Sequence, residues 1–265
     1  MRKQGKYTQV FDELVRYVGE FDSGFPRRIR TANRGSIETL QGLAAPNVLP
    51  EVYVAFLERM GADHGGLNIA IEGTTNIDDM IQSYWLARQN MAFAKGCSLL
   101  TDIISDNTLG LYQPAPESEP EVVVMGHDLA GTMDRRLPYA ESLPKLLFRG
   151  TFNKYQRRTF QKSTAYTSPD SSGWNRSHVP ELEKLAAELG FSRQWFSDAF
   201  QYCGKRGMDA TLSMEQFPER GVTLVISASC PEEIVRLAKP FQASVPGLEF
   251  SQWSRKREEQ QQSKP

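Results

Sequence analysis

The sequence has few of the residues that build metal sites, disulfide frameworks and nucleophilic catalytic centres. It contains 3 cysteines and 3 histidines in 265 residues. Cys97, Cys203 and Cys230 are too widely spaced for a disulfide framework or a zinc knuckle. The G-x-S-x-G pattern of a nucleophile elbow is absent as well. We therefore expect reduced cysteines, no metal, no cofactor and no catalytic nucleophile.

The sequence also lacks an excess of either charge and any long apolar run. Lys+Arg 31 against Asp+Glu 32 gives a net charge of -1, so no basic surface field favours nucleic acid. No apolar run approaches the roughly 18 residues that a membrane-spanning helix needs. Residues 4–13 are polar and mixed where a signal peptide would be apolar. We expect a soluble, cytoplasmic protein that binds neither a membrane nor a nucleic acid.

Residues 36–66 contain two amphipathic helical patterns with a proline break between them. Ile37 and Leu40 fall at helical spacing, and Pro46 then ends the first pattern because proline lacks an N–H. The second pattern begins at Pro50, since proline suits the first turn of a helix. Four residues follow at the i, i+3, i+4, i+7 spacing of one buried helix face, namely Tyr53, Phe56, Leu57 and Met60.

This stretch resembles the opening of the SUKH superfamily, the Smi/Knr-type domains, whose pattern is roughly I-x-x-L-E…LP-x-x-Y-x-x-F-L…GG. The matching positions are Ile37, Leu40, Leu49-Pro50, Tyr53, Phe56-Leu57 and Gly65-Gly66, while Gln41 stands where an acidic residue is usual. The segment from Ser142 to Leu147 looks like the closing helix of the family, so the resemblance covers about residues 30–150. It implies a central antiparallel sheet flanked by helices.

The region after residue 66 adds a helix and several strands. Residues 77–95 have helical periodicity, and their Met and aromatic residues, Trp85 among them, are expected in the core. Strands are expected at residues 98–104, 109–113 and 121–125. A strand-rich middle between helical ends predicts an α+β fold.

Composition divides the chain into two folded parts. Residues 1–150 form the SUKH-like domain with its N-terminal helix, and residues 151–176, which are mostly polar and charged, are expected to be a linker. A smaller α+β module follows at residues 177–250, with a hairpin and a helix whose capping box starts at Ser229. Residues 251–265 are expected to be a disordered tail.

Charged loops are the candidate contact sites. Loops held by a rigid scaffold often carry binding residues, and residues 62–65, 105–108 and 126–136 combine Asp, His or Arg with few apolar side chains. We take four of their side chains as candidate partner-binding residues, namely Asp63, Asp106, Asp128 and Arg135. Neighbouring pairs such as Asp63-His64 point in different directions, so we interpret them as solvated loop residues and not as metal ligands.

The SUKH resemblance implies a function in protein binding. Many bacterial members are immunity proteins, which bind a toxin domain and block its active site, and eukaryotic members regulate cell-wall synthesis and signalling. We therefore expect an immunity protein, not an enzyme, that blocks a cognate toxin by stoichiometric occlusion. Two alternatives stay open here: a regulatory scaffold of the Smi/Knr type, and an enzyme that uses loop carboxylates.

Overall fold

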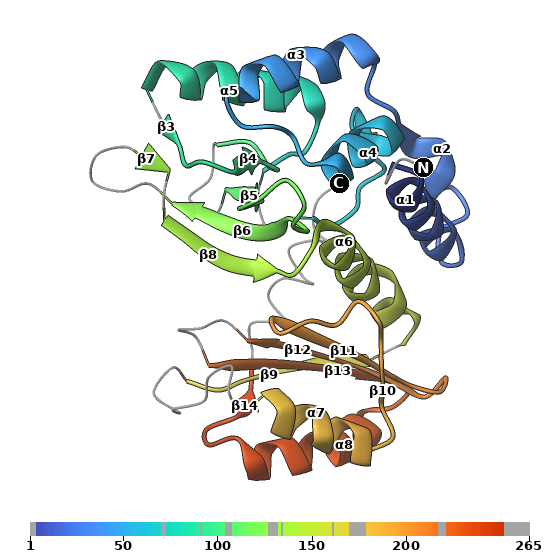
Figure 1. The fold of residues 1–265 in the computed structure, drawn as a ribbon. Helices are drawn as coiled ribbons and strands as arrows, with labels where there is room; N and C mark the ends of the chain where they lie inside the picture. Colours follow the sequence, from blue (N-terminus) through green and yellow to red (C-terminus); the bar gives the residue numbers. More distant parts are fainter. Residues whose placement is uncertain are drawn as a thin grey trace, which may run out of the picture. The chain divides into compact units, whose positions relative to one another are not determined.

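The chain consists of two compact units, residues Met1–Thr151 and Phe152–Pro265. The computed structural model describes residues 4–69, 73–90, 92–103, 108–126, 132–133, 135–160, 162–169, 179–216 and 221–251. Both units combine helices with antiparallel sheets (Figure 1), which confirms the α+β fold.

Unit 1 combines a four-stranded antiparallel sheet with several helices. The helices are α1 Gln4–Gly19, α2 Phe25–Arg28, α3 Arg34–Ala44, α4 Glu51–Met60, α5 Ile77–Asn90 and α6 Leu143–Thr151. The sheet has the order β4-β5-β6-β8, with bounds β4 Cys97–Leu99, β5 Leu109–Tyr112, β6 Glu121–Gly126 and β8 Arg135–Ala140. Two short pairs complete the unit: β1 Ile29–Arg30 with β2 Asp63–His64, and β3 Ala92–Phe93 with β7 Thr132–Met133.

The apolar stripe of α4 lies in the core of unit 1. Tyr53, Phe56, Leu57 and Met60 are all buried, as the helical spacing predicts. The ring of Phe56 lies 6.0 Å from that of Phe11 on α1 and 6.2 Å from that of Tyr53. Burial of these rings therefore fixes α1 against α4.

The strands predicted from the sequence are present, although β4 ends at Leu99 and not at residue 104. The edge strand β8 was not predicted. It contains Pro138, whose missing N–H is tolerated on an edge strand but argues against a strand when only the sequence is read. The pairing of β8 with β6 includes a register shift between Val122 and Val123.

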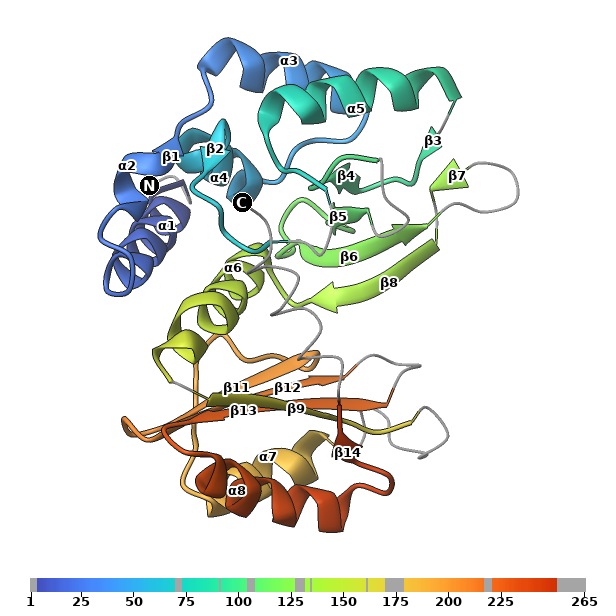
Figure 2. The ribbon, with the colours of Figure 1, turned by 180° about the vertical axis from the view of Figure 1, so that it is seen from behind.

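Helices α3 and α5 lie side by side (Figures 1 and 2). Asn76 precedes α5 and provides its N-terminal cap. Its Oδ1 accepts a hydrogen bond from the N–H of Asp78 at 2.9 Å, so the first turn of α5 is capped by an amide side chain.

Unit 2 is an antiparallel sheet of order β10-β11-β12-β13-β9-β14. Its strands are β9 Lys162–Thr167, β10 Ser192–Arg193, β11 Gln201–Arg206, β12 Ala210–Gln216, β13 Val222–Ala228 and β14 Glu249–Phe250. Helices α7 Val179–Glu188 and α8 Pro231–Ser244 cover one face of the sheet (Figures 1 and 2). The short helical turns η1 Phe152–Gln156 and η2 Arg157–Thr159 precede β9. The predicted hairpin is confirmed as β12 and β13.

The expected linker at residues 151–176 requires correction, because it contains β9. This strand pairs with β13 on one side and β14 on the other, and Tyr166 is buried in the core of unit 2. A strand needs few apolar residues to join a sheet, because alternate side chains face opposite sides and only one side faces the core. The polar Ser163 on β9 accepts a hydrogen bond from the hydroxyl of Ser227 on β13 at 3.0 Å.

Two further expectations concern the C-terminal part. Cys230, and not Ser229, occupies the cap position of α8, and its side chain makes no capping hydrogen bond. The capping box at Ser229 is therefore wrong. Of the expected tail, residues 252–265 lie outside the described part of the chain.

Candidate partner-binding surface

Of the four candidate contact residues, only Asp63 has both a described backbone and a described side chain. Asp63 is exposed on β2. Asp106 and Asp128 lie outside the described residues. Arg135 was assigned to a loop, but its backbone begins β8 and pairs with Gly126; its side chain is not among those described. Asp63 is thus the candidate around which a surface can be built.

Asp63 belongs to a segment, here named the 61–65 loop, that runs from Gly61 to Gly65 between α4 and the chain leading to α5. The N–H of Gly61 donates to Leu57 at 3.0 Å, and its carbonyl accepts from the N–H of Ile77 at 2.9 Å. The N–H of Ala62 donates to the carbonyl of Arg30 at 3.0 Å. Together with the β1–β2 pairing, these bonds hold the loop between three separate elements.

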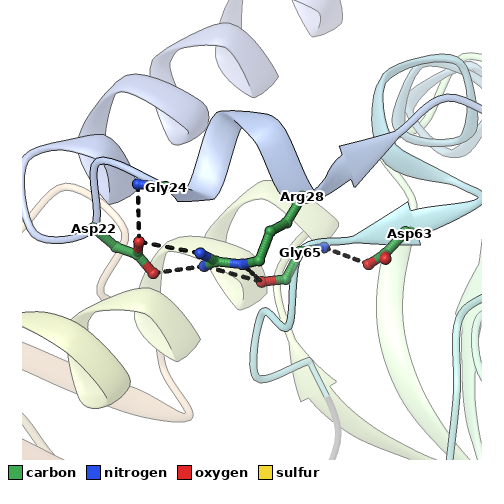
Figure 3. A network of polar contacts seen from close by, with 5 residues as sticks. All are labelled: Asp22, Gly24, Arg28, Asp63 and Gly65. Atoms are coloured by element: carbon green, nitrogen blue, oxygen red, sulfur yellow. Dashed lines mark hydrogen bonds and ion pairs between the residues drawn. The ribbon is translucent and has the colours of Figure 1, made fainter.

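The side chain of Arg28 clamps the far end of the loop (Figure 3). Its guanidinium donates to the carbonyl oxygen of Gly65 at 3.4 and 3.5 Å and to both carboxylate oxygens of Asp22 at 3.2 and 2.5 Å. Asp22 also accepts from the N–H of Gly24 at 3.1 Å. Because Asp22 orients the guanidinium from the opposite side, Arg28 has a defined position from which to hold the loop.

Asp63 has one oxygen engaged within the loop. Its Oδ1 accepts the N–H of Gly65 at 2.8 Å (Figure 3), which closes an Asx turn. Gly65 has φ +67, and a Cβ there would lie 2.7 Å from the ring of Phe25. Glycine is therefore required at this position, and the turn presents the carboxylate of Asp63 on the surface.

The start of α5 is joined to the same loop. The side-chain amide of Asn76 donates to the carbonyl of Ala62 at 2.6 Å, while its oxygen caps α5. Farther along α5, the hydroxyl of Tyr84 accepts the N–H of Leu99 on β4 at 2.9 Å. Burial raises the pKa of Tyr84 well above its ordinary value, so this hydroxyl stays neutral. Helix α5 is thus fixed at one end to the loop and in the middle to the sheet.

Helix α5 also carries an exposed apolar pair, Trp85 and Leu86. The buried apolar residues of α5 are Ile77, Met80, Tyr84 and Ala87, whereas Trp85, expected in the core, is 60% exposed. Successive helical residues are rotated by about 100°, so Trp85 points away from the stripe of Tyr84. The spacing of the four buried residues was the signal available in the sequence.

Five exposed residues share this side of the helix and are named the α5 outer face: Asp78, Asp79, Gln82, Trp85 and Leu86. Gln82 lies three or four positions from each of the other four, which places all five on one side of the helix. Leu86 is 49% exposed. The stripe begins beside the 61–65 loop, because the N–H of Ile77 bonds to Gly61.

Metal-ligand clusters and membrane-spanning helices are both absent from the described ranges. No group of three or more His, Cys, Asp or Glu side chains there could hold a metal ion. None of the helices in those ranges is both long and apolar enough to span a bilayer. In comparisons with known proteins, no family model, no curated protein and no solved structure matches this chain.

Proposed function

We propose that this protein works by binding a partner protein through the surface around the 61–65 loop. Following the SUKH resemblance, we further propose that the partner is a toxin domain and that the protein is an immunity protein that occludes it stoichiometrically. The observation that supports binding best is the set of hydrogen bonds from α4, β1, α2 and α5 that hold this loop and its exposed residue Asp63.

A loop held in this way suits recognition for an energetic reason. Ordering a flexible loop on binding costs free energy, and a preorganised loop avoids most of that cost. The loop backbone is already bonded within the protein at Gly61, Ala62 and Gly65. The exposed side chain of Asp63 is what the loop offers to a partner.

The charges beside the loop suit a polar contact. Arg30 on β1 lies opposite Asp63 on β2. Arg27 lies on α2, which precedes β1 in the chain. Arg27 and Arg30 are both exposed. A partner must place a basic group beside Asp63 and acidic groups beside the two arginines, and a partner with the wrong charges is repelled. These charges therefore contribute to specificity more than to affinity.

The experiment is co-expression with the toxic C-terminal domain of an exported protein encoded beside this chain, scored for survival and for a purified complex. Asp63→Asn keeps an oxygen that can accept the N–H of Gly65 but removes the charge, whereas Asp63→Ala removes both. If the charge contacts the partner, both variants weaken binding by about tenfold or more. The matched control is Glu13→Gln on the exposed side of α1.

The outcomes separate three explanations. Loss of binding in Asp63→Ala but not in Asp63→Asn assigns Asp63 to loop geometry alone. Unchanged binding in both variants moves the contact surface elsewhere on the protein. Absence of both survival and complex with the unsubstituted protein contradicts the immunity function and favours the regulatory scaffold.

A further inference from the structure

The α5 outer face has a composition that is specific enough to describe its partner. Trp85 and Leu86 expose apolar surface side by side in sequence, at 60% and 49%. Asp78 and Asp79 add two carboxylates at the start of the same stripe, and both are exposed. Neither makes an ion pair with a described residue, and the face has no described cationic side chain.

Two of the five residues on this face contribute to the stability of α5 itself. Acidic residues in the first turn of a helix are favoured by the helix dipole, so Asp78 and Asp79 stabilise α5 without any partner. Trp85 and Leu86 have no such role, because the core of α5 is already formed by Ile77, Met80 and Tyr84. An exposed tryptophan is a frequent anchor residue in protein interfaces.

We propose that the α5 outer face docks a protein surface that places cationic side chains beside an apolar pocket. The pocket accepts Trp85 and Leu86, and the cations pair with Asp78 and Asp79. This inference rests on the proposed binding function and specifies the chemistry of the partner. The stripe begins at the 61–65 loop, so one partner contacts both.

Charge complementarity favours a basic partner protein over a second copy of this chain at the α5 outer face. Two copies paired through this face would bring the carboxylates of Asp78 and Asp79 from both copies into one interface, with no described cation to offset them. Like charges brought together in an interface are unfavourable. A basic partner instead replaces the water lost from each carboxylate with a charged hydrogen bond.

The test uses two labelled amphipathic peptides of about 18 residues, long enough to form a helix. Each has leucine on one face, and the other face carries only lysine or only glutamate. Fluorescence anisotropy with the whole protein measures binding. We expect the lysine peptide to bind at least about tenfold more tightly than the glutamate peptide at about 0.1 M salt.

Three variants assign that binding to the face. Trp85→Ala and the pair Asp78→Asn with Asp79→Asn should each weaken the lysine peptide about tenfold. Glu13→Gln, on the exposed side of α1, with Glu20→Gln, at the exposed residue that follows α1, removes the same charge and should leave binding unchanged. Circular dichroism melting checks that each variant is folded, and Leu86→Ala provides a second apolar variant should Trp85→Ala fail that check.

Several results would overturn the inference. Equal binding of both peptides, or equal loss in the α1 control, shows that the recognition is not specific to this face. Light scattering that shows a dimer, dissociated by Trp85→Ala, assigns the face to a second copy. If the lysine peptide does not bind but the protein still blocks the toxin, the role of the α5 outer face is rejected and the proposed function stands. If the peptide binds but the protein does not block the toxin, the proposed function is rejected and the role of the face stands.

Discussion

The side-chain amide of Asn76 donates a hydrogen bond of 2.6 Å to the carbonyl oxygen of Ala62. The same side chain caps α5 through the N–H of Asp78. One residue therefore fixes the 61–65 loop and the start of the α5 outer face to each other. A partner would meet the loop and the helix as one rigid surface.

This double role of Asn76 gives the first prediction. Asn76→Ala removes both bonds and should lower the free energy of unfolding by about 1–2 kcal/mol. Asn76→Asp keeps the cap but loses the donor to Ala62, so it should preserve α5 and loosen the loop. Hydrogen exchange at the Gly65 amide should be faster in both variants, whereas the loss of the cap should appear only in the unfolding free energy of Asn76→Ala. Unchanged exchange at Gly65 in Asn76→Asp would show that the bond to Ala62 does not hold the loop.

The second prediction concerns the backbone of Gly65. Gly65→Ala meets two costs: a positive φ, which is unfavourable by about 1–2 kcal/mol for alanine, and a Cβ placed 2.7 Å from Phe25. Gly207→Ala, at φ +50 with no atom within 4 Å of its Cβ, meets the first cost alone. Urea unfolding should show the larger loss for Gly65→Ala, and equal losses would mean that Phe25 moves aside freely.

The third prediction tests the core of unit 1. Phe56 is fully buried between Phe11 and Tyr53, so Phe56→Ala should cost about 3–5 kcal/mol in thermal or urea unfolding. Val48→Ala is the control, because Val48 is 80% exposed and the change should stay within about 0.5 kcal/mol. A melting midpoint that Phe56→Ala leaves in place contradicts the assigned packing of α4.

Periodicity predicted the elements that bury one regular stripe. The α4 stripe, the three strands β4, β5 and β6, and the β12–β13 hairpin all follow from local pattern, because each has the spacing of its own element. Strand β9 could not be predicted in this way. Its membership in the sheet depends on pairing with β13, whose partner residues lie 56 to 66 positions later in the chain, and its own residues are mostly polar.

The candidate surface depended even more on contacts distant in sequence. Asp63 could be proposed from loop composition alone. The clamp from Arg28 and the amide of Asn76 could not, because both bonds join the loop to other elements. Trp85 was misplaced because an aromatic residue next to a buried stripe was read as part of it, although one helical step turns it toward solvent.

The fourth prediction concerns acid stability and Glu233 of unit 2. Hydrogen bonds from Arg236, at 2.7 and 2.6 Å, and from Arg206 lower the pKa of Glu233 from 4.5 to about 2. The folded pKa lies below the unfolded one, so the stabilisation is present above the unfolded value and is lost as pH falls toward the folded value.

Glu233→Gln supplies the measurement. Glu233→Gln should lower the free energy of unfolding measured in urea at about pH 7. The difference in this free energy between the variant and the unsubstituted protein should shrink as pH falls from 4.5 toward about 2. Glu249→Gln, on exposed β14, is the matched control. A difference that stays constant across this pH range would show that the two arginines do not stabilise the carboxylate.

The central claim is that the protein blocks a partner by occupying its surface. If the partner is a toxin domain, as proposed, titrating a fixed amount of that domain with this protein and measuring residual toxin activity tests the claim most directly. Occlusion predicts that inhibition is complete at one molecule of this protein per toxin molecule, and that it is incomplete at that ratio for the weaker-binding variants Asp63→Asn and Trp85→Ala. Inactivation of a molar excess of toxin, as turnover by a catalyst would give, contradicts the account.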